Sequence, residues 1–184
     1  MNAGIADYDD SKDGELPVML HRVQIIEQIR QSQVTVIISE TGSGKTTQIP
    51  QFLVDYYLKD DDVVAVTQPR RVAAITVAQR VAAERRGRVG EECGYVVRFD
   101  DCTSSRTRIK YLTDGVLVRE CLRDPSLSRY AVIMLDEAHE RSLSTDILLG
   151  EFDPFLSWHT FTVYVSSITS FFPVVHSQYV SITS

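Results

Sequence analysis

Short runs of apolar, largely β-branched residues alternate along this chain with longer segments of helical character. Residues 34–38, 63–66 and 130–135 form such runs, and none of them contains a charged side chain. Runs of this kind are typical of strands covered on both faces of a parallel sheet. Periodicity predicts helices over residues 16–33, a segment ending near 58, 71–86, 114–122 and 143–149, and further strands over 95–99 and 107–112. The alternation predicts an α/β fold with a doubly wound, mostly parallel sheet.

Composition and length indicate one globular domain with unusual ends. The chain has 184 residues, 43% hydrophobic and 24% charged, which suits one buried core and is too short for two full domains. We expect a flexible acidic lead over residues 1–15, a domain over 16–151 and an atypical tail over 152–184. The net charge of −6 is not that of a basic nucleic-acid binder. The domain nevertheless keeps arginines that allow a local positive face: Arg70, Arg71, Arg80, Arg85, Arg86 and Arg88.

The cysteines and the two ends of the chain exclude several classes of protein. The cysteines number three and include no C-x-x-C pair, which argues against a disulfide frame or a zinc site and favours a reducing compartment. The first ten residues are acidic without an apolar core, so they do not form a signal peptide. Residues 154–184 contain no Asp, Glu, Lys or Arg. Because this tail includes Pro173 and many hydroxyls and has no flanking positive charge, we expect an aggregation-prone or loosely docked β segment and no membrane span.

A glycine-rich loop, GSGKTT at residues 42–47, lies between the run 34–38 and a helical segment. Glycines let backbone N–H groups surround a phosphate, and the helix N-terminus adds partial positive charge. Lys45 would reach the β- and γ-phosphates, and the Thr46 hydroxyl would hold Mg²⁺. The pattern G-x-x-x-x-G-K-[ST] is met except at its first place, where Ser39 stands. An ordinary glycine turn before a helix is the alternative, but the strand–loop–helix context favours a phosphate loop.

Two carboxylates, Asp136 and Glu137, directly follow the run 130–135. Ligands of open parallel sheets bind beyond the carboxyl ends of the strands, so this pair is expected at the same edge as the phosphate loop. One carboxylate could hold Mg²⁺ while its neighbour orients and deprotonates an attacking water. Taken alone, the pair could be a helix N-cap with a solvated neighbour. His139 has no partner at zinc-ligand spacing, so alone it is a surface or packing histidine.

Five stretches of the sequence resemble the DEAH-box RNA helicases and occur in that family's order and spacing. They are ETGSGKTTQIPQ (40–51), TQPRRVAAITVAQRVA (67–82), GYVVRFDD (94–101), YLTDGVLVRE (111–120) and LDEAHERSLSTDILLG (135–150). The resemblance covers roughly residues 16–150, nearly the whole first RecA-like domain of such a protein. It implies a RecA-like P-loop NTPase domain of an ATP-hydrolysing RNA helicase with ATP and Mg²⁺ as its cofactors.

The resemblance also implies roles for residues at the nucleotide. The triphosphate would be bound by the loop residues Gly42, Ser43, Gly44, Lys45, Thr46 and Thr47, with Lys45 also catalytic. Thr46, Asp136 and Glu137 would serve Mg²⁺, and Glu137 would be the general base. Arg80 stands where the family stacks an arginine on adenine, and arginine does stack well on flat rings. His139 would couple hydrolysis to a second domain.

Contacts to the RNA backbone are implied for Arg70, Arg71, Thr113, Asp114 and Gly115. An arginine pair after the strand-ending Pro69 suits phosphate contact, which carries no sequence specificity. A solvated helix start is the alternative for the arginine pair. Residues 85–90 (RRGRVG) imitate an arginine-rich motif of the family's second domain, but they precede the carboxylate pair. We interpret them as a helix C-terminus with a basic last turn and Gly87 as its cap.

The resemblance stops near Glu151, before the second motor domain in which the family carries arginines that stabilise the transferring phosphoryl group. We therefore expect a truncated ATP-dependent RNA helicase, with residues 152–184 derived from alternative splicing, a frameshift or a gene-model error. A catalytically inactive isoform that binds nucleotide, RNA or partners is the alternative, and a P-loop ATPase acting on DNA or in viral replication is a weaker one. The resemblance further suggests helicase adaptor proteins as partners and an intracellular location, nuclear before cytoplasmic.

Overall fold

Strands from the whole length of the chain form one sheet in the computed structural model, which describes residues 16–137, 148, 161–166 and 178–182. Among these residues the sheet has eight strands in the order β4-β3-β5-β2-β6-β7-β1-β8. All neighbouring strands are parallel except β3 and β4. The strands are β1 (Val34–Ser39), β2 (Val64–Gln68), β3 (Cys93–Val97), β4 (Asp100–Cys102), β5 (Ile109–Thr113), β6 (Val132–Leu135), β7 (Phe161–Ser166) and β8 (Gln178–Ile182). The predicted α/β fold with a mostly parallel sheet is confirmed.

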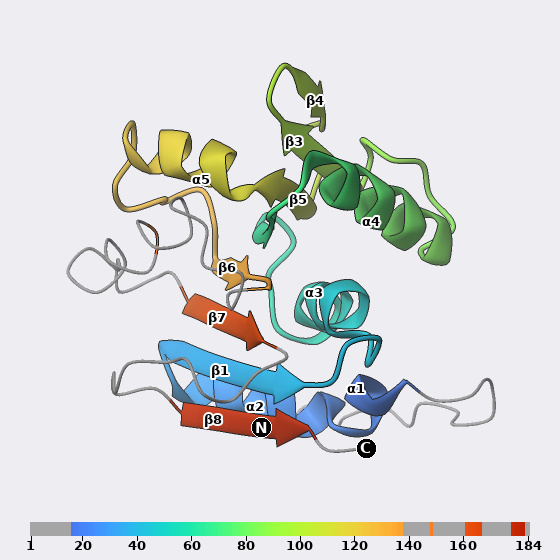
Figure 1. Cartoon of the computed structure of the whole chain (residues 1–184), viewed down its shortest axis with the longest axis vertical. Coiled ribbons are helices and arrows are strands. Elements are labelled where there is room, and N and C mark those ends of the chain that lie inside the picture. Colours follow the sequence, from blue (N-terminus) through green and yellow to red (C-terminus); the bar gives the residue numbers. More distant parts are fainter. Residues whose placement is uncertain (1–15, 138–147, 149–160, 167–177, 183–184) are drawn as a thin grey trace.

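Helices cover both faces of the sheet, as the doubly wound prediction requires. They are α1 (Pro17–Leu20), α2 (Arg22–Gln31), α3 (Lys45–Tyr56), α4 (Arg71–Glu84) and α5 (Asp114–Cys121). Figure 1 shows α3 and α4 on one side of the central strands and α5 on the other. Residues of α1 to α4 share one buried cluster with Val64 and Val66 of β2, whereas α5 packs in a second cluster with Ala65. Successive strand residues point to opposite faces, so one apolar run supplies both cores.

The first predicted helix is wrong in one respect, because residues 16–33 form two helices. The chain breaks at His21, whose φ of −102° and ψ of 9° are not helical. Ile25, Ile26 and Ile29 of the second helix are buried in the core, whereas Val23 is 45% exposed. None of the helices in the described part of the chain has the length and apolarity needed to cross a membrane.

The strand expected over residues 95–99 begins and ends earlier than predicted. The chain turns after β3 through Phe99, which has a left-handed φ of 68°, and returns as β4. This antiparallel hairpin was not predicted because the turn lacks the Gly or Asn that usually marks such a conformation. The helix expected over residues 143–149 lies outside the described residues, apart from Leu148, which is helical and buried.

The end of α4 differs in detail from the helix C-terminus expected over residues 85–90. Arg86, not Gly87, takes the left-handed conformation with φ of 56°. The N–H of Gly87 donates to the Ala82 carbonyl at 2.9 Å and that of Arg86 to Ala83 at 3.0 Å, a Schellman pattern displaced by one residue from the prediction. Arg85 is no solvated end charge, because it contacts Asp55 at 2.9 Å and Glu92 at 2.8 Å.

The tail, where a β segment was expected, contributes two strands to the sheet, and their places in the strand order were not predicted. β7 lies between β1 and β6 and pairs in parallel with both, and β8 lies on the other side of β1. In Figure 1 both strands run alongside β1. The strand that precedes the phosphate loop and the strand that precedes the carboxylate pair are therefore separated by one strand of the tail.

Candidate functional site

The loop between β1 and α3 depends on two glycines with left-handed backbones. Gly42 has φ of 85° and Gly44, which immediately precedes α3, has φ of 91°. L side chains rarely adopt this conformation. At Gly44 space is also limiting, because a Cβ there would lie 2.8 Å from the Leu16 side chain. The GSGKTT pattern thus produces a tight loop that leads directly into a helix N-terminus, a geometry suited to anions.

Lys45 is the cation of this loop and is held by several hydrogen bonds. It is only 5% exposed. Its ammonium donates to the carbonyls of Ser39 at 2.6 Å and Glu40 at 2.7 Å and to the Ser43 hydroxyl at 3.3 Å. Burial lowers the pKa of Lys45, although the carboxylates of Asp136 and Glu137 act against that shift. The loop therefore holds a cation that is partly desolvated and poorly compensated.

Ser39, which stands where the phosphate-loop pattern has glycine, fits the loop without disturbing it. Its hydroxyl is 2.6 Å from the hydroxyl of Ser43, and both residues are buried. This hydrogen bond ties the end of β1 to the middle of the loop.

The structure brings the loop and the carboxylate pair together. The Thr46 hydroxyl donates to Asp136 Oδ2 at 2.5 Å, and the Gln68 amide donates to the same oxygen at 2.6 Å. The backbone N–H of Glu137 donates to Asp136 Oδ1 at 3.0 Å. Burial raises the pKa of Asp136 to about 6, against the opposing effect of the bonds from Thr46 and Gln68. Asp136 is thus a desolvated carboxylate beside a loop hydroxyl.

A pocket of about 160 Å³ opens beside the loop. Glu137 lines it together with Lys45 and Thr46, and Arg80 of α4 forms another part of its wall. Glu137 has a left-handed φ of 49°, which is uncommon for a residue with a side chain and clusters at functional sites. The expected nucleotide residues therefore share one cavity, with a cation, a carboxylate and a guanidinium around it.

The residues expected at an RNA backbone lie at the ends of two paired strands. Gln68 and Thr113, the last residues of β2 and β5, are register partners. Arg70 and Arg71 follow the first strand and are exposed, and Gly115 follows the second and is exposed as well. Asp114 is only 5% exposed, so its carboxylate is not part of that surface. His139 lies outside the described residues.

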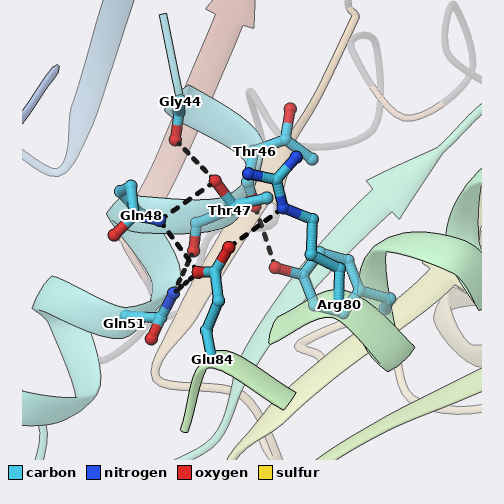
Figure 2. A network of polar contacts seen from close by, with 8 residues as sticks. Gly44, Thr46, Thr47, Gln48, Gln51, Arg80 and Glu84 are labelled. Carbon is cyan, nitrogen blue, oxygen red and sulfur yellow. Dashed lines mark hydrogen bonds and ion pairs between the residues drawn. The ribbon is translucent and has the colours of Figure 1, made fainter. Parts of the chain in front are cut away.

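Sequence reasoning missed three polar residues that support the site. Gln68 bonds Asp136 directly, as described above. Tyr111 is fully buried and its hydroxyl donates to the Thr46 carbonyl at 2.8 Å; burial raises its pKa well above the usual value. Glu84 of α4 receives bonds from α3 and from Arg80 (Figure 2). A polar residue that ends an apolar strand could have pointed to Gln68, whereas Tyr111 and Glu84 carry no such local signal.

The sequence of this chain is similar to those of known RNA helicases. The chain is 51% identical over 136 residues to the pre-mRNA-splicing factor ATP-dependent RNA helicase DEAH10 of Arabidopsis thaliana. It is 55% identical over 137 residues to the protein of Saccharomyces cerevisiae named probable ATP-dependent RNA helicase DHR2. Each alignment covers 73% of this chain and 19% of the relative, so the chain spans about a fifth of the length of these curated relatives. No family model matches the chain.

These alignments confirm the resemblance noted in the sequence. Identity of 51–55% over 73% of the chain makes it a homologue of DEAH-box ATP-dependent RNA helicases across that region. The mostly parallel α/β sheet is consistent with the RecA-like domain of those proteins.

Proposed function

We propose that this chain binds ATP with Mg²⁺ at the loop of residues 42–47 and contacts RNA backbone beside it, as the first motor domain of a DEAH-type RNA helicase. The single observation that carries the proposal is the 2.5 Å bond from Thr46 to Asp136, because Thr46 lines a pocket together with Lys45 and Glu137. A loop for phosphates and a pair of carboxylates serve one triphosphate only when they meet at one place.

Binding of the triphosphate is assigned to the loop backbone and to Lys45. The backbone N–H groups around Gly42 and Gly44 and the start of α3 supply donors and partial positive charge. The Lys45 ammonium now donates to carbonyls at 2.6 and 2.7 Å, and it would exchange these partners for phosphate oxygens. The exchange is favourable because phosphate oxygens carry negative charge, whereas the two carbonyl partners are neutral.

The donor set fits Mg²⁺. A hydroxyl of Thr46 and a carboxylate of Asp136 already lie within hydrogen-bond distance, and hard oxygen ligands are those that Mg²⁺ prefers. When bound, the metal ion neutralises charge on the phosphates. Glu137 lies next in the chain and lines the same pocket, which assigns to it the orientation of the attacking water and removal of its proton.

Contacts to the adenine base and to the RNA backbone are assigned to three arginines. Arg80 lines the pocket although it lies far from the loop glycines in the sequence. Its planar cation is suited to stacking on adenine. Arg70 and Arg71, with Thr113 and Gly115 at the neighbouring strand end, would contact RNA phosphates and sugars without reading sequence.

Nucleotide titration tests the proposal. Lys45→Ala should abolish binding of a labelled, non-hydrolysable ATP analogue in the presence of Mg²⁺, because the buried cation is removed from the phosphates. Lys59→Ala, a change of the same type at an exposed position, is the matched control and should bind as the unmodified chain does. Equal binding by all three proteins would refute the site.

Turnover by this chain is a separate question from binding. Steady-state ATP hydrolysis with and without added RNA distinguishes a working motor from a module that only binds nucleotide, RNA or partner. We expect ATP binding with negligible turnover from the chain alone, and robust RNA-stimulated hydrolysis would exclude the binding-module alternative. The division into residues 1–15, 16–151 and 152–184 belongs to the same proposal, as do adaptor partners and the nuclear location suggested by a relative named as a pre-mRNA-splicing factor.

A further inference from the structure

Glu84, near the end of α4, joins two helices through its carboxylate. Its Oε2 accepts hydrogen bonds from Gln48 Nε2 at 3.0 Å and from Gln51 Nε2 at 2.9 Å, both on α3. Its Oε1 accepts from Arg80 Nε at 2.9 Å, one turn earlier on α4. Figure 2 shows the carboxylate between the two amides and the arginine. One oxygen is therefore held by the helix of the phosphate loop and the other by the arginine of the pocket.

Arg80 needs such a partner if it is to have a defined position. Its side chain is 62% exposed, compared with 31% for Glu84. An exposed arginine samples many rotamers, and the fork of donors is useful only when it is oriented in advance. In Figure 2 the guanidinium is directed toward Thr46 and Thr47, which line the same pocket as Arg80. The contact with Glu84 selects rotamers that place the guanidinium beside that pocket.

A simple surface ion pair on one helix does not explain this arrangement. In such pairs the acid stabilises better when it precedes the base, and here Arg80 precedes Glu84. An exposed pair alone also contributes little. The amides of Gln48 and Gln51 fix the carboxylate from the neighbouring helix, which a pair within α4 would not require. Burial raises the pKa of Glu84, but the hydrogen bonds from Arg80, Gln51 and Gln48 outweigh it and the pKa is lowered.

We propose that Glu84 is a positioning residue that anchors Arg80 to α3 and so holds the guanidinium for stacking on the base of a bound nucleotide. The inference rests on the proposed nucleotide site and adds to it a residue that touches no part of the nucleotide. Its consequence is selective: affinity for the base depends on Glu84, whereas affinity for the triphosphate depends on the loop and Lys45.

Titration of two probes separates these contributions. The full chain is titrated, with Mg²⁺, with a non-hydrolysable ATP analogue and with inorganic tripolyphosphate, which lacks a base. Glu84→Gln should weaken binding of the ATP analogue about two- to fivefold, the range of an exposed cation–π contact, and leave binding of tripolyphosphate unchanged. Arg80→Ala should cause the same base-dependent loss, and the double variant should lose nothing further, because both changes remove one interaction. Glu27→Gln, an exposed site on α2, is the matched control.

The possible outcomes are distinct. Equal loss of both probes in Glu84→Gln would overturn the inference, because Glu84 would then act on the phosphate loop through Gln48. Loss of neither probe would also overturn it, leaving an ordinary ion pair. Equal binding by the unmodified chain and Lys45→Ala would instead show that the nucleotide site itself is wrong, and the inference with it. Unfolding midpoints check each variant, and Glu84→Asp, which keeps the charge but shortens its reach, should repeat the base-dependent loss if Glu84→Gln does not fold.

Discussion

Two clusters of charged side chains in this molecule differ in how their charges are compensated. At the phosphate loop, burial lowers the pKa of Lys45 and raises that of Asp136, so burial acts against the charged form of each group. At the end of α4, the hydrogen bonds that Arg85 donates to Glu92 and Asp55 raise the pKa of Arg85, and Arg85 lowers the pKa of Glu92. The charges of the second cluster satisfy one another, whereas those of the first remain to be compensated.

The difference supports the proposal that a ligand binds at the phosphate loop. Charged side chains that serve only stability are paired with groups of opposite charge. Arg85 is an example, because it lies between two carboxylates at 2.9 and 2.8 Å. Desolvated charges held apart from close counter-ions cost stability and persist where a bound group supplies the compensation. A metal ion with a triphosphate would bring a cation to Asp136 and anions to Lys45.

The largest expected effect comes from Asp136→Asn. The substitution removes the anionic oxygen needed for Mg²⁺, so Mg²⁺-dependent binding of a non-hydrolysable ATP analogue should fall on the order of 100-fold. Unfolding free energy at pH 7 should stay the same or rise, because the amide avoids desolvation of a charge. Calorimetric titration and chemical denaturation measure the two quantities. Retained nucleotide binding together with a large loss of unfolding free energy would mean that Asp136 stabilises the fold and does not bind Mg²⁺.

Arg85→Ala should give the reverse result. Its side chain is only 17% exposed, and its removal leaves the carboxylates of Asp55 and Glu92 without their shared partner. We expect a loss of about 2 kcal/mol in unfolding free energy, between the values of exposed and buried ion pairs. Affinity for the ATP analogue, measured on the folded variant, should not change. A weakened nucleotide affinity in the folded variant would contradict the separation of the two clusters.

The two clusters should also respond to pH with opposite signs. The folded-state pKa of Asp136 is raised to about 6, so the native state binds more protons than the unfolded chain and stability falls as pH rises through that value. Between pH 5 and 7 this amounts to about 1 kcal/mol, and Asp136→Asn should remove it. The pKa of Glu92 is lowered, so its contribution is present at neutral pH and lost as pH falls below its unfolded value. Denaturation curves from about pH 3 to 7, without nucleotide or Mg²⁺, would measure both slopes, and a slope between pH 5 and 7 retained by Asp136→Asn would count against the first assignment.

The sequence was sufficient for the parts of the site that are local in the chain. A β-branched run, glycines, a lysine and a helix define the phosphate loop without knowledge of the rest of the fold. The meeting of Thr46 with Asp136 follows from one more rule, that parallel strands present their carboxyl ends at one edge.

The remaining contacts depend on which elements are neighbours. Gln68 reaches Asp136 because β2 pairs with β6, an order that the two strands do not encode by themselves. Glu84 meets Gln48 and Gln51 only because α4 packs beside α3. The hairpin turn through Phe99 was not predicted because its residues carry no turn signal. The tail was expected to form a β segment, but its residues do not encode that β7 lies between β1 and β6.

The smallest expected effect comes from Arg129, an arginine that also contacts a carboxylate but is far more exposed than Arg85. Arg129 contacts Glu120 at 3.4 Å, and its side chain is 60% exposed. Because water screens such a pair and ordering the arginine costs entropy, Arg129→Ala should change unfolding free energy by less than about 0.5 kcal/mol. Its stability, measured beside Arg85→Ala in the same denaturant series, shows whether burial decides the effect of an arginine–carboxylate contact here. A loss as large as that of Arg85→Ala would mean that arginine removal itself, and not the satisfied charges at the end of α4, accounts for the difference.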